Sequence, residues 1–476
     1  MGIPLLTCTD PTHRLWTKSS LPDSCSVSRS RPSPSHGPHQ DMRREVLRLA
    51  VPAFLALVAE PLFLLADSAI VGYLGTASLA GLGVASGVLL TAVNIFVFLA
   101  YGTTAVVARR LGAGDQRGAL AAGIDGVWLS LLLGVAAAAV VAVWAGPIVA
   151  LFGATPEASA EAVTYLRVST LGIPPMLMVL SATGVLRGML DTRTPLLVAT
   201  VGFTANAALS LLLVHGLGLG IAGAAWGTVV AQTGMALALV GVVVRGARRL
   251  GAPLTFTAAG VLRSALDGVP LLVRTLALRA VMLLTTWVAA GVGEPELAAH
   301  QVAMTVWSAL AFALDALAIA AQALTGRSLG AGDVESTRAV TWMMVRWSVW
   351  FGVVLAVLIV ALHRVIPLGF TSDDQVRAAL AATLLVVAVG QPVAGVAFVL
   401  DGVLIGAGDA RWLAVAQTVF LLAYLPMVLG VWASGVDGVP GLVWLWVAFT
   451  GWMVVRTVGL VRRARGDAWM VTGAAR

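Results

Sequence analysis

Cysteine and lysine are almost missing from this chain of 476 residues. The two cysteines are Cys8 and Cys25, so residues 41–476 have no disulfide, thiol nucleophile or cysteine-ligated metal. The single lysine, Lys18, excludes a Gly-Lys-Ser/Thr phosphate loop and an intramembrane Schiff-base lysine. The motifs His-Glu-x-x-His and Gly-x-Ser-x-Gly are also missing. We therefore expect no enzyme, no catalytic residue, no bound metal and no cofactor.

Charge is also scarce, at 11% of residues against 59% hydrophobic residues. Residues 79–107 form a charge-free run that exceeds the roughly 20 apolar residues needed to cross a bilayer. The sequence thus predicts an all-α polytopic membrane protein, with the lipid bilayer as a partner. The net charge of +7 comes from short basic clusters between the apolar runs, which does not indicate binding of nucleic acid.

The segment 1–40 is rich in Ser, Pro, His and Thr and contains no apolar core of a signal peptide. We expect residues 1–41 to form a disordered extension. Met42 precedes two arginines and the first apolar segment, so we predict that the natural protein starts there or does not need residues 1–41.

Twelve membrane spans are predicted along the rest of the chain. We expect an N-terminal half at 42–244, a linker at 245–263, a C-terminal half at 264–465 and a cytoplasmic tail at 466–476. The predicted spans are 46–73, 79–108, 119–151, 160–186, 195–215, 219–244, 264–292, 297–326, 338–369, 376–405, 411–433 and 440–461.

The two halves repeat one another at a constant offset along the chain. Residues 108–115, Ala-Arg-Arg-Leu-Gly-Ala-Gly-Asp, match Gly-Arg-Ser-Leu-Gly-Ala-Gly-Asp at 326–333, and residues 184–193 match 402–411 at the same offset. Six spans per half make the repeats parallel, with a central cavity expected between them near the midplane. Because no strand precedes the Gly-Ala-Gly-Asp loops and no lysine follows them, we interpret them as tight turns.

Most arginines outside the spans fall on one side of the predicted topology, whereas glutamates and aspartates predominate in the opposite loops. This asymmetry predicts a multi-pass protein of the cell membrane with both termini in the cytoplasm. Nothing in the sequence requires a second copy, and we expect a monomer.

Asp67, Asp315 and Asp401 are the acidic residues inside predicted spans that we single out. Ionised acids are costly in lipid, so such residues usually face a partner or a wet cavity. Burial favours the neutral form of a carboxyl group, which suits reversible protonation of Asp67. The alternatives are that Asp67 caps a break at Pro61, and that the other two form structural ion pairs. Arg279 is the candidate counter-ion.

Several motifs resemble the MATE family, the multidrug and toxic compound extrusion proteins. They are Pro-Leu-Phe-Leu-Leu-Ala-Asp-Ser-Ala-Ile-Val-Gly-Tyr-Leu-Gly at 61–75, the Arg-Leu-Gly-Ala-Gly-Asp loop and Arg-Gly-Met-Leu-Asp-Thr-Arg-Thr-Pro at 187–195. Residues 273–278 and 315–324 are similar to the DinF branch. The resemblance, over about residues 44–465, implies cation-coupled efflux of amphipathic, often cationic small molecules by alternating access. It matches the family's first-helix aspartate to Asp67.

Neutral polar residues inside the spans are further candidates for the cavity, although interhelical hydrogen bonds explain such residues as often. They are Asn206, Gln301, Gln322 and Gln391, to be added to Asp401, Asp315 and Arg279. Prolines within or beside the spans predict helix bends at Pro61, Pro174 and Pro392.

The leading hypothesis is a proton-coupled antiporter, with sodium coupling as the second choice. The resemblance associates a sodium site with a glutamate that some branches of the family have in the seventh span, where this chain has Arg274 and Arg279. The alternative is a lipid-linked oligosaccharide or lipid flippase of a related fold, which needs several basic cavity residues. The duplication is not kept at the acids: Asp67 corresponds to Thr285 in the other half. We therefore expect ion coupling in the N-terminal half.

Overall fold

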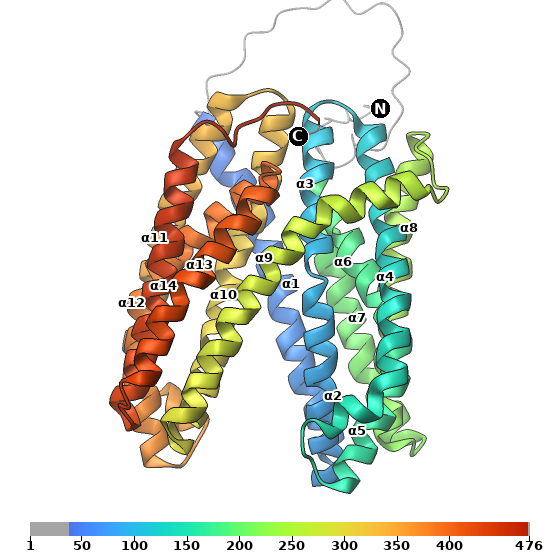
Figure 1. The fold of residues 1–476 in the computed structure, drawn as a ribbon. Helices are drawn as coiled ribbons and strands as arrows, with labels where there is room; N and C mark the ends of the chain where they lie inside the picture. Colours follow the sequence, from blue (N-terminus) through green and yellow to red (C-terminus); the bar gives the residue numbers. More distant parts are fainter. Residues whose placement is uncertain (1–37, 475–476) are drawn as a thin grey trace, which may run out of the picture.

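The protein is built from long helices arranged as two bundles (Figure 1). The computed structural model describes residues 38–474, and within that range it describes the side chains except those of residues 38–43 and 60–66. No strand occurs among the described residues. The predicted N-terminal extension, residues 1–41, lies outside the described residues except for 38–41, which already belong to the first helix.

In the described range, the first bundle consists of eight helices and the second of six, with short 3-10 or π turns at three places. The first contains α1 (Pro38–Gly72), α2 (Thr76–Ile95), α3 (Phe98–Gly112), α4 (Gln116–Ala150), α5 (Pro156–Ser169), η1 (Thr170–Gly172), α6 (Ile173–Gly188), α7 (Arg193–Leu211), η2 (Leu212–Gly216) and α8 (Gly220–Arg249). The second contains α9 (Ala258–Val292), α10 (Glu294–Gly330), α11 (Val334–Leu362), η3 (Ile366–Gly369), α12 (Asp374–Gly406), α13 (Ala410–Ala433) and α14 (Gly438–Arg465).

These helices confirm the predicted polytopic membrane fold. Eleven described segments, from Thr76–Gly112 to Gly438–Arg465, are long and apolar enough to cross a membrane, and α1 occupies the position of the first predicted span. Four spans are less regular than predicted. The span at 79–108 consists of α2 and α3, separated at Phe96 and Val97, and the span at 160–186 contains η1. The span at 195–215 ends in the π turn η2, and α11 ends at Leu362 instead of 369.

The two halves form a V in Figure 1. They meet at the end of the molecule that carries Pro38 and the last described residues, and they diverge towards the opposite end. We call the end where the halves meet the termini end. Helix α9 crosses between the halves, since it packs on α3 and α4 near its beginning and on α13 further along. The connection at residues 250–257 lies inside the predicted linker.

The Gly-Ala-Gly-Asp loops are tight turns, as predicted from the sequence. Gly114 and Gly332 both have φ of 79°, a left-handed conformation that favours glycine. Asp115 then caps α4 by accepting a hydrogen bond of 2.8 Å from the Gly118 amide, and Asp333 caps α11 in the same way. The two halves therefore change direction with the same local chemistry.

Glycine also allows the halves to touch at the termini end. A Cβ at Gly112 would overlap the carbonyl oxygen of Arg327, and a Cβ at Gly330 would overlap that of Arg109. Gly112 is the counterpart of Gly330 in the repeat, and Arg109 is the counterpart of Arg327. The contact is thus made by equivalent backbone surfaces of the two halves, related by an approximate two-fold axis.

The segment after α14 crosses the joint between the halves. Arg109, from the first half, donates hydrogen bonds of 2.7 Å to the carbonyls of Ala407 and Val471, and one of 3.0 Å to that of Gly473. The Gly473 amide donates to the Leu329 carbonyl at 3.0 Å. Since Arg109 is buried, these charge-assisted bonds hold the C-terminal segment across the contact between the halves at the termini end.

Replacing Gly330 with alanine is expected to separate the halves at the termini end, because the added methyl group has no room beside the Arg109 backbone. Arg117 and Glu335 are exposed equivalents in the two halves, and residues 41–476 contain no cysteine. The measurement uses a chain in which Cys8 and Cys25 are replaced and in which Arg117 and Glu335 are each changed to cysteine. Spin labels attached to these two cysteines should lie farther apart in the Gly330→Ala variant.

The matched control is Gly430→Ala in α13, where an added Cβ meets no neighbour within 4 Å. This variant undergoes the same change in helix propensity, about 1 kcal/mol in favour of alanine, without the steric overlap. An unchanged distance between the spin labels in Gly330→Ala would show that the glycine contact does not hold the halves together at the termini end.

Candidate functional site

The acid of the first half, Asp67 on α1, is surrounded by hydroxyl groups. Its side chain is 4% exposed. Tyr165 on α5 donates a hydrogen bond of 3.4 Å to one carboxyl oxygen, and Ser210 on α7 donates one of 3.3 Å to the other. No described arginine or histidine pairs with Asp67. The carboxyl group is therefore buried with neutral partners.

The polar network around Asp67 extends to α8. Ser210 lies 3.0 Å from the Asn206 side-chain oxygen, and the Asn206 amide donates to the Thr228 hydroxyl at 3.3 Å. A serine hydroxyl has one hydrogen, so Ser210 donates either to Asp67 or to Asn206. The geometry thus allows two hydrogen-bond arrangements of Ser210.

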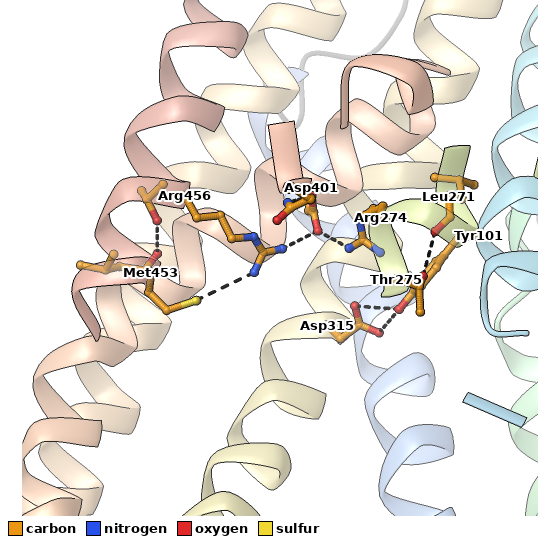
Figure 2. Close-up of polar contacts among 11 residues, drawn as sticks. Tyr101, Leu271, Arg274, Thr275, Asp315, Asp401, Met453 and Arg456 are labelled. Atoms are coloured by element: carbon orange, nitrogen blue, oxygen red, sulfur yellow. Dashed lines mark hydrogen bonds and ion pairs between the residues drawn. The ribbon is translucent and has the colours of Figure 1, made fainter. Parts of the chain in front are cut away.

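The acid of the second half has the opposite environment. Asp401 on α12, 3% exposed, lies between two buried arginines, Arg274 on α9 and Arg456 on α14 (Figure 2). Arg456 is 2.5 Å from the Asp401 carboxylate, and Arg274 is in direct contact with it. Gln417 on α13 donates to the other oxygen at 3.5 Å. Asp401 is thus an ionised group held by charged partners.

Asp315 on α10 joins the halves close to this cluster. The hydroxyl of Tyr101, from α3 of the first half, donates to the Asp315 carboxylate at 3.2 Å (Figure 2). Gln322, one of the predicted cavity residues, donates to the Tyr101 carbonyl at 2.6 Å. The guanidinium of Arg274 lies 5.7 Å from the centre of the Tyr101 ring. Tyr101 therefore contacts both the acid and the nearer arginine of the second half.

The expected pairing of Arg279 with the acids is wrong. Arg279 is exposed, and the buried partners of Asp401 are Arg274 and Arg456. Arg279 lies five residues after Arg274 on α9, so the two side chains point to different faces of that helix. Sequence reasoning chose an arginine on α9, the helix that does provide a partner of Asp401, but it could not show which face of α9 points towards Asp401.

The remaining predicted residues are spread over the molecule. Gln301 is exposed near the start of α10, whereas Gln391 is buried in α12 and donates to the Val387 carbonyl at 3.1 Å. Pro174 follows the break at η1, as expected for a bend, and Pro392 lies inside α12. At Pro61 the backbone is helical, but the side chain lies outside the described residues. A binding role for these residues stays a prediction.

Sequence reasoning missed Arg456, Tyr101, Tyr165 and Thr228. Arg456 lies within the predicted span at 440–461, so an arginine inside an apolar run was the available signal. The tyrosines and the threonine gave no signal, because such residues are ordinary in apolar helices. In the described part of the chain, no three His, Cys, Asp or Glu side chains gather as a metal would need.

A duplicated bundle of membrane-spanning helices, with a few buried acids and arginines between and inside its halves, defines a membrane transporter of the carrier class. The MatE family model matches residues 52–212 and again residues 270–432. The two matches correspond to the two halves of the repeat. The chain therefore belongs to the MatE family, whose members are transporters and not enzymes.

Curated relatives place the chain near the DinF branch, as the motifs indicated. It is 31% identical over 471 residues to Protein DETOXIFICATION 44, chloroplastic, of Arabidopsis thaliana, which covers 94% of this chain and 88% of that protein. It is 30% identical over 442 residues to DNA damage-inducible protein F of Escherichia coli strain K12, covering 88% and 92%.

Solved structures share the fold. A Vibrio cholerae MATE transporter, VcmN, superposes with a TM-score of 0.81 at 21% identity, covering 90% of this chain and 97% of that chain. A MOP superfamily transporter from Pyrococcus furiosus superposes with a TM-score of 0.80 at 22% identity, covering 89% and 95%.

Proposed function

We propose that this protein is a cation-coupled antiporter that exports amphipathic small molecules by alternating access, and that protons rather than sodium ions drive it. The observation that carries the proposal is the environment of Asp67, a buried carboxyl group that meets only hydroxyl groups among the described residues. Because no arginine compensates its charge, gaining and losing a proton is the simplest way for Asp67 to change state.

The arrangement of Asp67 supports coupling to conformational change. Its carboxyl group ties α1 to α5 and α7 through Tyr165 and Ser210. An ionised Asp67 accepts from both hydroxyls, whereas a protonated Asp67 also has a hydrogen to donate. Protonation therefore alters which bonds hold α1 against its neighbours, and helix α1 also packs on α10 of the other half.

Protons are preferred to sodium because of the second half. The resemblance associates a sodium site with a glutamate in the seventh span, and α9 has Arg274 and Arg279 in that region. A buried guanidinium would repel a sodium ion placed beside it. We therefore assign ion coupling to the first half.

We propose that the protein is a monomer of the cell membrane, and the distribution of arginine supports an orientation with the termini end in the cytoplasm. Arg109, Arg187, Arg248, Arg327 and Arg463 lie at or near helix ends on that side. With that orientation the halves are closed towards the cytoplasm and diverge towards the outside. The conformation then corresponds to the state that releases substrate outside and takes up protons there.

The proposal is tested in everted membrane vesicles that contain the protein, with proton and sodium gradients imposed separately. Two xanthene dyes, the cation rhodamine 6G and the anion fluorescein, serve as probes so that the result does not depend on substrate charge. We expect an acidic lumen to drive accumulation of at least one dye. Accumulation driven by sodium alone, or by neither gradient, would contradict proton-coupled export.

A further inference from the structure

The buried acids Asp67 and Asp401 have opposite surroundings. In the first half, Asp67 is an acid without a described cationic partner. In the second half, two guanidinium groups, those of Arg274 and Arg456, share one carboxylate, that of Asp401. This cluster thus holds one positive charge more than its own carboxylate balances. A surplus charge in a low-dielectric interior is costly unless another group compensates it.

Both arginines also have unused hydrogen-bonding capacity. The Nε atoms of Arg274 and Arg456 are buried and have no hydrogen-bond partner in the described structure. The two residues are 8% and 3% exposed, respectively. A guanidinium has five N–H donors in a planar fork that matches the oxygens of a carboxylate, sulfonate or phosphate. The cluster therefore has donors that Asp401 alone does not satisfy.

Arg274 is the arginine of this pair that faces the other half. Figure 2 shows it between Asp401 and Tyr101, whereas Arg456 lies on the far side of Asp401. The ring that lies beside Arg274 belongs to Tyr101, at 5.7 Å, and Tyr101 is held there by its bond to Asp315. Tyr101 and Arg274 belong to different halves, so a movement that separates the halves uncovers Arg274.

Asp315 is the nearest acid that balances the surplus charge. It lies within electrostatic range of Arg274 and Arg187, and its one described hydrogen-bond donor is the neutral Tyr101. When the halves separate, Asp315 loses Tyr101, and Arg274 loses the ring beside it. An anionic group from outside the protein then competes with Asp315 for Arg274.

We propose that the substrate is an amphipathic molecule with an anionic oxygen group, and that Arg274 binds this group while Arg456 keeps Asp401 in place behind it. This inference rests on the proposed export function and gives it a substrate class. It departs from the expectation of cationic substrates that the family resemblance supplied. The first half carries the proton, and the second half recognises the charge of the substrate.

The test is a binding titration without any ion gradient, so a failure of proton coupling does not affect it. Purified protein in phosphatidylcholine nanodiscs is titrated with fluorescein and with rhodamine 6G. We expect saturable binding of fluorescein. Arg274→Gln, which leaves a balanced pair of Asp401 and Arg456, is expected to weaken it at least about tenfold, or about 1.4 kcal/mol. Arg274→Lys keeps the charge without the fork and should fall between the two.

Asp315→Asn separates a binding role from a structural one. Removing this competing acid should leave fluorescein binding unchanged or tighter, although it removes a charge from the same region just as Arg274→Gln does. The control is Arg346→Gln, which removes an exposed arginine on α11 and should change nothing. Thermal unfolding of each variant shows that it is folded. Equal weakening by Asp315→Asn and Arg274→Gln would overturn the proposal.

The lipid composition of the nanodisc distinguishes a free solute from a lipid headgroup as the anion that Arg274 binds. An anionic lipid headgroup offers the same oxygen chemistry as a free acid. We expect fluorescein to bind equally well when phosphatidylglycerol is included, whereas competition by this lipid would overturn the assignment to a free solute. Binding of rhodamine 6G without fluorescein, or of neither dye, would also overturn it.

Discussion

Replacing Asp67 with asparagine is expected to abolish proton-driven accumulation of substrate while leaving the protein folded. Asparagine has nearly the same shape and still accepts a hydrogen bond from Tyr165 or Ser210, which lie 3.4 and 3.3 Å from the carboxyl oxygens. It cannot bind or release a proton between pH 5 and 9. The substitution therefore removes the ionisation and little else.

The measurement is substrate-driven proton flux in proteoliposomes, followed with a pH-sensitive dye inside the vesicles. In the Asp67→Asn protein, this flux should fall to the level of protein-free vesicles, whereas binding of the substrate to detergent-solubilised protein should persist. The matched control is Asp267→Asn, the same change at an exposed position of α9. Undiminished flux in the Asp67→Asn protein would exclude Asp67 as the proton carrier.

Replacing Asp401 with leucine is expected to produce the largest loss of stability. The change leaves Arg274 and Arg456 side by side in the interior without the carboxylate that separates them. Removing one member of a buried ionic cluster typically costs about 3–5 kcal/mol, because the remaining charge is uncompensated. Since domains are stable by only about 5–15 kcal/mol, little folded protein should be recovered.

The control for Asp401 removes the whole cluster. A triple variant with Arg274→Met, Arg456→Met and Asp401→Leu contains no buried charge at these positions, and apolar replacements of this kind are often neutral or stabilising. Thermal unfolding in detergent should show an early transition for Asp401→Leu alone and recovery in the triple variant. Similar transitions for all three proteins would mean that the cluster does not constrain the fold.

Much of the fold could be predicted because it depends on local properties of the chain. Apolar runs determine which segments cross the membrane, and the match of the loop at 108–115 to that at 326–333 relates the two halves. Turn chemistry was equally local: Gly114 and Asp115 adopt the left-handed and capping roles that their side chains favour. The three intramembrane acids were found for the same reason, because a carboxyl group is conspicuous in an apolar run.

The partners of those acids could not be predicted, because they depend on how helices are rotated and packed. Arg274 and Arg456 are 127 and 55 residues from Asp401 in the sequence. A helix that is apolar on all sides has no pattern that shows which face meets a neighbour. Sequence reasoning therefore chose Arg279 on α9, and the structure shows Arg274 as the partner of Asp401.

The contact of Arg109 with the C-terminal segment has an evolutionary consequence. Its acceptors are main-chain carbonyls, those of Ala407, Val471 and Gly473. A carbonyl is present whatever side chain the residue carries, so substitutions at position 471 leave its acceptor in place, whereas Gly473, with φ of 103°, favours glycine. Selection should then act on the identity of Arg109, on the length of the segment after α14 and on the buried Trp469, while position 471 accepts other side chains. An insertion or deletion there would be eliminated more readily than a substitution.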